Sequence, residues 1–480
     1  MKLRLSFLLP VVTLLASCAP TPPPDAPSAI ARLYPDYRGV TIPRAIAPLN
    51  FMCLSDSVDA VCATFASGDK SVRVAARGRK VVVDEDEWRA LLADSSTSSL
   101  SVSLLYRLGG EFRKDTFSLF VSDDVFDPFV TYRLIEPGYE VWNALQIEER
   151  DLTSFSTRLL ADNSDLGGNC MNCHIHGQGG LTSLFHVRGK GGGSFLFRGG
   201  RLSKVELKNE HMSGGAVYGD IDSSGRFGVF STNVIIPALH SEGSRRLEVF
   251  DTESDLCAAD FESQRMIVSP SVARTDRLET FPCFAPDGRS VYFCSAPALP
   301  LPDSLASVRY SVMRVGFDGS AFADEVDTVW SAESNGGSAS FPRVSPDGRF
   351  LLFCVSRCGT FPIWHRETDF RMIDLASGRE VDVSPLNSPL SETFHSWASS
   401  SRWVAFASKR GDGQYGRVFI AHVDADGRPS RPFVIPQADP ESDILCLKSY
   451  NIPDLSPVAA GFGRRMVEKV FLGEEAAGFK

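Results

Sequence analysis

Composition and repetition together predict a mainly β protein. The chain of 480 residues contains 39 glycines and 29 prolines, which favour turns, and 33 phenylalanines, which favour strands. This length accommodates two or three domains with buried cores. Because the second half of the chain repeats itself, we expect an N-terminal β-rich, sandwich-like module, a short helical segment and a C-terminal β-propeller.

The N-terminus has the pattern of a processing signal. Lys2 and Arg4 precede a largely apolar run, residues 5–15, which is shorter than the ~20 residues that a membrane-spanning helix needs. The run ends in Leu-Ala-Ser-Cys18, which resembles the lipobox of bacterial lipoproteins. We therefore expect residues 1–17 to be a signal peptide and Cys18 to carry the lipid. The alternative is an ordinary secretory signal followed by an incidental cysteine.

Export sets the compartment and limits the partners. Proline-rich residues 18–33 are expected to form an extended tether. The predicted location is the cell envelope, lipid-anchored and facing the periplasm or the cell surface, where disulfides and c-type haem attachment are possible. A formal net charge of -10, without an extended basic cluster, argues against nucleic acid as a partner. The lipid is then the only predicted contact with the membrane.

Residues 34–146 are predicted to form the β-rich module. Residues 101–106 and 117–121 alternate as strands do, and a short helix is expected near residues 86–92. Residues 147–185 are assigned to a helix and a cofactor segment, because apolar residues between 147 and 163 recur at helical spacing. Residues 186–457 are assigned to the propeller, and residues 458–480 to a C-terminal tail.

The propeller prediction rests on four copies of one pattern. The sequence Phe281-Pro-Cys-Phe-Ala-Pro-Asp-Gly-Arg matches Phe341-Pro-Arg-Val-Ser-Pro-Asp-Gly-Arg, and weaker copies begin at Tyr218 and Phe394. The turn glycine or its equivalent falls at positions 225, 288, 348 and 401, at intervals of about 60 residues. Each copy is a strand, a tight turn and a second strand. A second hairpin signal follows at Asp251, Asp318, Asp374 and Asp424, which gives four strands per repeat, as in a propeller blade.

These Ser-Pro-Asp-Gly-Arg repeats resemble the TolB-like family of WD-like β-propellers over residues 185–457. The chain is more narrowly similar to envelope lipoproteins in which such a propeller follows a Cys-x-x-Cys-His segment. Tyr34-Pro-Asp-Tyr, Ile135-Glu-Pro-Gly-Tyr-Glu and Ser449-Tyr-Asn-Ile-Pro carry that closer similarity. The resemblance implies an architecture and no settled biochemical role.

The motif with the most specific chemistry is Cys170-Met-Asn-Cys173-His174, which matches the attachment site of c-type cytochromes. Cys170 and Cys173 would form thioethers with one covalent haem c, and His174 would be the proximal iron ligand. A chain of this composition contains the motif by chance roughly 0.004 times. Two alternatives remain: a Cys-x-x-Cys disulfide, and a zinc site made by Cys170, Cys173, His174 and His176.

A sixth ligand would decide what a haem does. His186 is the first candidate, because glycines at 177, 179 and 180 would let the chain turn round the macrocycle. His211, Met212 and His240 are the other candidates. Trp364, His365, His395 and Trp397 are interpreted as propeller packing. The chain contains no Gly-x-Ser-x-Gly or His-Glu-x-x-His motif.

The sequence therefore favours a lipid-anchored, monohaem c-type cytochrome-like protein for electron transfer or redox sensing. Its propeller would dock an envelope redox protein or another envelope protein. The alternatives are a non-enzymatic envelope scaffold that binds protein or glycan and keeps a structural haem, and a peroxidase-like haem enzyme.

The remaining cysteines give two further expectations. Cys53 and Cys62 are close enough in sequence for a small disulfide loop. Cys283, Cys294 and Cys354 are interpreted first as buried apolar residues.

Overall fold

The computed structural model describes residues 26–136, 143–212, 214–239, 247–473 and 475–480, apart from the side chains of Cys173 and Leu239. Cys18 and His240 therefore lie outside the described residues. The elements are predominantly strands, which confirms the prediction of a mainly β protein. Within the described ranges, no helix is long and apolar enough to cross a membrane.

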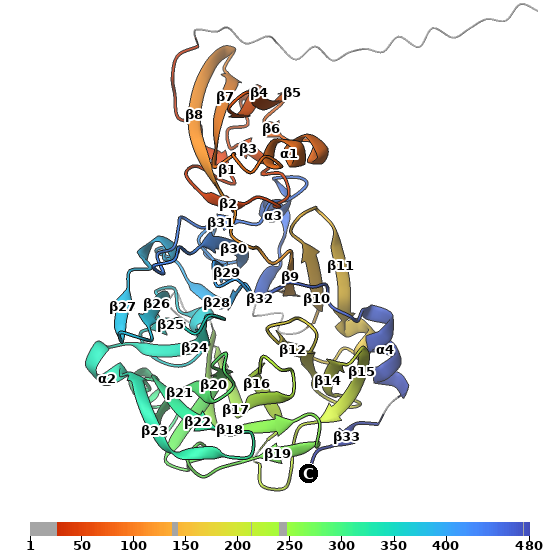
Figure 1. Ribbon diagram of the computed structural model, residues 1–480, viewed down its shortest axis with the longest axis vertical. Coiled ribbons are helices and arrows are strands. Elements are labelled where there is room, and N and C mark those ends of the chain that lie inside the picture. Colours follow the sequence, from red (N-terminus) through yellow and green to blue (C-terminus); the bar gives the residue numbers. More distant parts are fainter. Residues whose placement is uncertain (1–25, 137–142, 213, 240–246, 474) are drawn as a thin grey trace, which may run out of the picture.

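The N-terminal module contains two sheets and one helix (Figure 1). The larger sheet has the order β2-β8-β7-β4-β5 and the smaller has β1-β3-β6. The helix α1, Glu85–Leu92, begins after Asp84, whose carboxylate accepts from the N–H groups of Asp86 and Glu87. The strands are Leu33–Tyr34 (β1), Thr41–Pro43 (β2), Phe51–Cys53 (β3), Val58–Ser67 (β4), Lys70–Arg77 (β5), Lys80–Val81 (β6), Ser99–Leu108 (β7) and Glu111–Ser122 (β8).

Six sheets form the blades of a propeller (Figure 1). Four blades take consecutive strands of the chain. They are β16 to β19 (Ala216–Ile221, Phe227–Leu239, Leu247–Asp260, Arg265–Ile267), β20 to β23 (Arg277–Phe284, Ser290–Pro297, Ser311–Phe317, Phe322–Trp330), β24 to β27 (Ser338–Val344, Phe350–Ser356, Asp369–Asp374, Arg379–Val381) and β28 to β31 (Glu392–Trp397, Trp403–Ser408, Arg417–His422, Phe433–Val434).

The other two blades also use strands that were predicted to lie outside the propeller, because β9 to β12 and most of β13 precede residue 186. One has the order β11-β10-β9-β32, so that residues from both ends of the propeller share a sheet. The other is β12-β13-β14-β15, extended by β33, which pairs in parallel with β15. Their strands are Phe129–Ile135 (β9), Leu145–Asp151 (β10), Thr157–Asp162 (β11), Met171–His176 (β12), Ser183–Val187 (β13), Gly193–Arg198 (β14), Arg201–Glu206 (β15), Ser449–Ser456 (β32) and Ala477–Gly478 (β33).

The ring closes through the inner strands. Each inner strand contacts the next around the channel, in the order β32, β12, β16, β20, β24, β28 and back to β32. Because β32 comes from the C-terminal part of the chain and pairs with β9, the closing blade joins the two ends of the ring. Short helical segments connect the strands: α2 (Ala332–Asn335), α3 (Ser442–Leu445), α4 (Arg464–Gly473), η1 (Asn163–Leu166), η2 (Leu305–Ser307), η3 (Pro362–Trp364) and η4 (Ser384–Leu386).

The predicted helix within residues 147–163 is wrong, because this stretch forms β10, a turn and β11. Burial alternates along β10, as expected for a strand, and the helical spacing came from apolar residues on both sides of the turn. The propeller therefore begins at Phe129 and not at residue 186. The tail after residue 457 is also folded, because α4 and β33 pack on the β12 to β15 blade.

The predicted turns are confirmed with one exception. Gly225, Gly288 and Gly348 have φ of 69°, 67° and 74°, and Ser401 takes the same left-handed conformation at 61°. Asp251 makes no turn, because it lies buried within β18. The turn of that blade falls at Asp260, whose Oδ1 accepts from the N–H groups of Glu262 and Ser263.

The N-terminal module shares a hydrophobic core with the last blade. Trp403 of β29 is fully buried in a cluster that also contains Phe51 and Trp88 of the module. Lys80 forms ion pairs with Asp439 and Glu441 across the boundary, at 2.8 and 2.9 Å. Buried apolar contacts and ion pairs therefore hold the module against the propeller.

The cysteine expectations divide. Cys53 and Cys62 are both free and buried, so the expected disulfide is wrong. Instead, the Nε of Arg73 donates to the Sγ of Cys62 at 3.2 Å. Cys283, Cys294 and Cys354 are buried and free, as predicted.

Candidate functional site in the channel

Every inner strand has a β-bulge at a corresponding position. The register shifts fall within residues 172–175, 216–218, 280–283, 340–343, 393–395 and 451–454. In four bulges a non-glycine residue has φ between 48° and 53°: Phe281, Phe341, Phe394 and Ile452. Aromatic and β-branched residues rarely adopt this conformation, and such strain concentrates at functional sites. The repetition of this strain around the ring indicates that the channel is a candidate functional site.

The bulge residues fill one level of the channel with aromatic rings. The ring centroids of Phe281 and Phe341 are 4.0 Å apart, and those of Phe341 and Phe394 are 4.5 Å apart. Tyr218 packs edge-on against Phe281 at 4.9 Å. These four aromatic residues, together with Ile452, are called the aromatic plug.

The predicted haem motif lies on β12, the inner strand of a blade. Its backbone register places Cys173 and His174 in the bulge, at the position that Phe281 and Pro282 occupy in β20. Cys170 precedes the strand and is half-buried, with the amide of Asn172 donating to its Sγ at 3.6 Å. The motif is thus also the β12 version of the inner-strand repeat.

His174 is buried within the channel wall. Its Nε2 lies 3.4 Å from the carbonyl oxygen of Thr131, and within the described residues its Nδ1 has no hydrogen-bond partner. Burial, reinforced by the neighbouring His176 and Arg133, lowers the pKa of His174 to about 3. The ring is therefore neutral, as an iron ligand must be.

The surroundings of His174 do not fit a haem in this fold. The two cavities that His174 lines have volumes of about 90 and 40 Å³. A cofactor of drug-like size occupies a pocket of about 300 Å³ or more. A haem on His174 would require part of β12 to leave the blade.

The zinc alternative finds no support from His176. Its Nδ1 lies 2.7 Å from the Oγ of Ser183, and its Nε2 lies 3.0 Å from the Oγ1 of Thr131, so both ring nitrogens are engaged. Among the described residues, no group of three or more His, Cys, Asp or Glu could hold a metal ion. The side chain of Cys173 is outside that description.

The sixth-ligand candidates lie in different places. His186 pairs across the ladder with Asn172, and its Nδ1 lies 2.7 Å from the Oγ of Ser194. Its ring faces Phe230 of the neighbouring blade and lines neither cavity beside His174. His211 is exposed, and Met212 packs at the edge of a core cluster. The structure therefore does not bring His174 and His186 together at one cavity.

Beside the aromatic plug, the channel becomes polar. On each of three inner strands, the side chain two positions after the residue in the aromatic plug accepts a hydrogen bond from the backbone of the next inner strand. Asp454 accepts from the N–H of His176 at 2.8 Å, and Ser396 accepts from the N–H of Leu455 at 3.0 Å. Asp220 in the same way accepts from the N–H of Phe284 at 2.9 Å. These contacts fasten neighbouring blades to one another at the end where the inner strands finish, here called the polar mouth.

Arg343 breaks this pattern. It occupies the corresponding position on β24 but carries only donors. Its Nη1 donates to the carbonyl of Pro342 at 3.2 Å, and its Nη2 donates to the carbonyl of Gly219 at 3.4 Å. Within the part of the chain that is described, Arg343 has no carboxylate within ion-pair distance, although Asp220 and Asp454 line the same 90 Å³ cavity. Because these two contacts use only part of its five donors, the guanidinium is a candidate ligand-binding group.

His395 lines the same cavity and was interpreted from sequence as packing. It is 5% exposed, and its Nε2 lies 2.9 Å from the carbonyl oxygen of Leu352. Among the described groups its Nδ1 has no partner. The packing interpretation does fit His365, which is fully buried against Glu248 at 3.0 Å, and Trp397, whose Nε1 donates to the carbonyl of Arg343.

Burial shifts the charges of the polar mouth. Desolvation raises the pKa of Asp454 to about 7 and also raises the pKa values of Asp220 and Asp127. Arg343 opposes the shift at Asp220 and Asp454 by its positive charge. Burial lowers the pKa of His395 to about 3, so this ring is neutral.

Sequence reasoning missed Arg343, Asp220 and Asp454. A usable signal was present, because aligning the residues before each turn gives Thr-Phe-Pro-Cys283, Ser-Phe-Pro-Arg343, Thr-Phe-His-Ser396 and Asn-Ile-Pro-Asp454. The arginine is the only cation in this set of four. The alignment also includes Asn-Cys-His-Ile175, which contains the second half of the haem motif.

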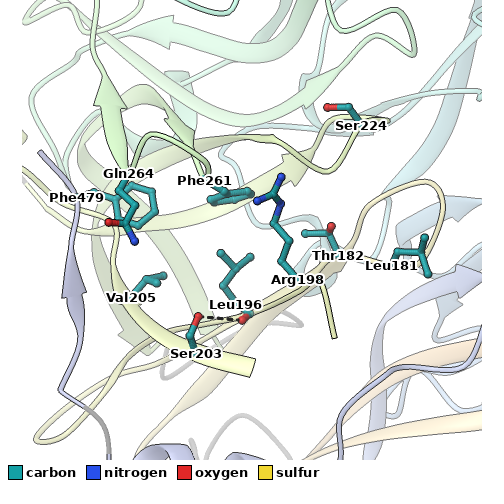
Figure 2. Close-up of a pocket in the computed structure, with 11 residues that line it drawn as sticks. Leu181, Thr182, Leu196, Arg198, Ser203, Val205, Ser224, Phe261, Gln264 and Phe479 are labelled. Atoms are coloured by element: carbon teal, nitrogen blue, oxygen red, sulfur yellow. Dashed lines mark hydrogen bonds between the residues drawn. The ribbon is translucent and has the colours of Figure 1, made fainter. Parts of the chain in front are cut away.

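A larger cavity of about 540 Å³ lies between the β12 to β15 and β16 to β19 blades (Figure 2). Leu196, Phe261 and Phe479 contribute apolar surface. Arg198 donates to the carbonyl of Gly225 at 2.9 Å and pairs with Glu262 at 2.8 Å, so its charge is already compensated. None of the sequence-predicted site residues lines this cavity. We therefore place the candidate site in the channel.

The fold and channel define a six-bladed β-propeller protein with an N-terminal β-rich module. No known family model matches the sequence. No curated protein matches it either.

Solved structures resemble the chain at low identity. TolB from Acinetobacter baumannii is 11% identical, with a TM-score of 0.42, over 78% of this chain and 86% of that chain. The Pseudomonas aeruginosa periplasmic gluconolactonase PpgL is 13% identical, with a TM-score of 0.33, over 65% of this chain and 97% of that chain. A Mycobacterium tuberculosis puromycin-hydrolyzing peptidase is 12% identical, with a TM-score of 0.35, over 83% of this chain and 57% of its own length. At these identities and scores, the likenesses say nothing about the activity of this chain.

Proposed function

We propose that this protein is a lipid-anchored envelope protein whose propeller binds a partner through the polar mouth of its channel. The observation that supports this most directly is the asymmetry of the channel. The aromatic plug fills one level. Beside it the buried Nδ1 of His395 has no partner among the described residues, and the half-buried guanidinium of Arg343 has donors beyond its two carbonyl contacts. Buried polar groups normally have partners, so this part of the channel favours a bound molecule.

The envelope location rests on the sequence alone. The Leu-Ala-Ser-Cys18 segment and the proline-rich tether support a propeller that is held at a membrane surface by lipid alone. The proposed partner is an envelope protein, and a glycan is the alternative. This function requires no catalytic residue.

Docking at the polar mouth is testable by site-specific photocrosslinking in the native host. Gln178 is exposed and lines the cavity at the mouth, whereas Arg366 is exposed beyond η3, away from that cavity. With p-benzoylphenylalanine at position 178, we expect a discrete adduct to an envelope protein, identified by mass spectrometry. The same group at position 366 should give no such adduct. Equal adducts at both positions, or none at 178, would contradict docking at the mouth.

A monohaem redox protein is the second candidate function, favoured by the Cys170-x-x-Cys173-His174 sequence. A haem supplies one-electron chemistry when bound. The chain would contribute the thiols of Cys170 and Cys173 and the neutral ring of His174. His186 as the sixth ligand stays a prediction for a chain in which β12 has rearranged.

The haem candidate predicts a covalent adduct. Protein from the native envelope, denatured and stained for haem peroxidase activity, should give a band near the full-length mass, because thioethers survive denaturation. The double variant Cys170→Ser, Cys173→Ser should lose the band. If wild-type protein from a host with cytochrome c maturation is unstained and has no haem absorption, the redox function is excluded and docking remains.

A further inference from the structure

The acceptor groups of the polar mouth specify what a ligand must donate. A backbone carbonyl only accepts hydrogen bonds, so the Nε2 of His395, 2.9 Å from the oxygen of Leu352, carries the ring proton. The Nδ1 of this neutral ring therefore has a lone pair. In the described part of the chain nothing donates to it, although it is buried. His395 lines the cavity, so its ring reports on a donor bound beside it.

The donor groups specify the other end of the ligand. The guanidinium of Arg343 has five N–H donors, and its contacts to two backbone carbonyls and to the thiol of Cys283 leave others unused. Arginine binds carboxylates with two parallel hydrogen bonds. The positive charge of Arg343 lowers the pKa values of Asp220 and Asp454. Within the described residues, neither carboxyl group lies within ion-pair distance of the guanidinium. The guanidinium and these carboxyl groups thus face one cavity across a gap.

The charge of the whole mouth argues against a simple ion. The groups that face the cavity are Asp127, which precedes β9, with His174 and His176 on β12, Asp220 on β16, Arg343 on β24, His395 on β28 and Asp454 on β32. A lone anion would meet three carboxyl groups, and a lone cation would meet Arg343. A molecule with both charges satisfies both sides.

We propose that the polar mouth binds a small α-amino acid in its zwitterionic form. The ammonium group faces the carboxylate of Asp454, close to His395, and the carboxylate of the ligand faces Arg343. The small volume of the cavity, about 90 Å³, favours a ligand of the size of glycine or alanine. This inference goes beyond the proposed function and shares its site, the polar mouth.

The test is a titration followed at His395 itself. The chain contains only eight histidines, so protein labelled with 15N in histidine gives few ring signals, and His395 is assigned by its loss in His395→Gln. Glycine and alanine should shift its Nδ1 signal saturably. Ethylammonium, which has only the ammonium group, and acetate, which has only the carboxylate, should bind at least tenfold more weakly.

Two variants separate binding from folding. Arg343→Gln should weaken glycine binding at least tenfold, whereas Arg289→Gln, an exposed arginine in a repeat turn, should bind as wild type. If Arg343→Gln does not fold, Asp454→Asn takes its place, because an amide oxygen still accepts from the N–H of His176. The proposal is overturned if neither amino acid gives a saturable shift, or if ethylammonium or acetate alone binds as tightly as glycine. Crosslinking at position 178 is independent of these outcomes, so the docking function can stand if the amino-acid proposal fails.

Discussion

A chain that ends after Lys448 is expected to lose the cooperative fold of the propeller. Such a chain lacks β32, which supplies the inner strand of the closing blade and pairs with β9. Each buried apolar side chain removed costs about 2–5 kcal/mol, and each buried backbone group left without a partner costs about 1–3 kcal/mol. Losing Leu455 and the hydrogen-bond ladder to β9 therefore costs about as much as the whole free energy of unfolding of a typical domain, about 5–15 kcal/mol.

The measurement is thermal or urea unfolding followed by circular dichroism. A chain that ends after Gly473 is the matched control, because it keeps β32 and α4 and loses only the segment containing β33. This control should keep a single cooperative transition. A peptide of residues 449–473 added to the shorter chain should restore part of that transition. If the chain ending after Lys448 unfolds at the wild-type midpoint, the closing-blade account is wrong.

The closure of the ring shows what the sequence could and could not predict. The Asp-Gly-Arg turns have a local cause: the aspartate side chain hydrogen-bonds to the nearby backbone, and the glycine adopts a positive φ. The turns at Gly288 and Gly348 could therefore be predicted from the sequence. The pairing of β32 with β9 depends on contacts between residues more than 300 positions apart. No local pattern reports such a pairing, so strands β9 to β12 were assigned to other parts of the chain.

The helix expected within residues 147–163 failed for a related reason. Leu152 is buried in the turn region, and Leu160 is buried on β11. Counted as one run, these residues mimic the spacing of one helix face, although a turn separates their strands. A short apolar run does not by itself distinguish a helix from two strands.

The channel site depends even more on tertiary context. The Cys170 to His174 motif indicated cofactor chemistry because of its residue types, and in the structure it is an inner strand with a bulge. In the sequence, Arg343 is an ordinary member of a repeat. Comparison with the other inner strands shows that the equivalent residues Asp220 and Asp454 accept hydrogen bonds, whereas Arg343 donates them. The position of a residue relative to equivalent residues in other blades identified the site better than its own motif did.

Acid is expected to destabilise the protein well before its carboxylates are fully protonated. Four buried histidines have lowered pKa values because of desolvation: about 3 for His174 and His395, and about 4 for His176 and His186. An unfolded histidine titrates near 6.5. Between pH 6.5 and 4 the unfolded chain therefore binds more protons than the folded chain, and the free energy of unfolding falls as the pH falls.

Carboxyl groups with raised pKa values give the opposite slope over an overlapping pH range. Desolvation raises the pKa of Asp251 to about 7 and that of Glu279 to about 8. Unfolded Asp and Glu side chains release their protons near pH 4 and the folded forms keep them, so this contribution to the free energy of unfolding falls between about pH 4 and pH 7 to 8. Below pH 6.5 it offsets part of the histidine slope, and above pH 6.5 it acts without the histidine contribution.

One substitution and one control test whether the buried ring of His186 contributes to the loss of stability at acid pH. Each unit of pKa difference corresponds to about 1.4 kcal/mol, so His186 contributes roughly 3 kcal/mol that disappears toward pH 4. His186→Gln keeps a polar group within reach of Ser194 and removes the titration, so its urea midpoint should fall less steeply between pH 6.5 and 4.5. His211→Gln, an exposed control, should follow the wild type. A wild-type midpoint that stays constant from pH 7 to 4.5 would show that these rings do not set the acid stability of the propeller.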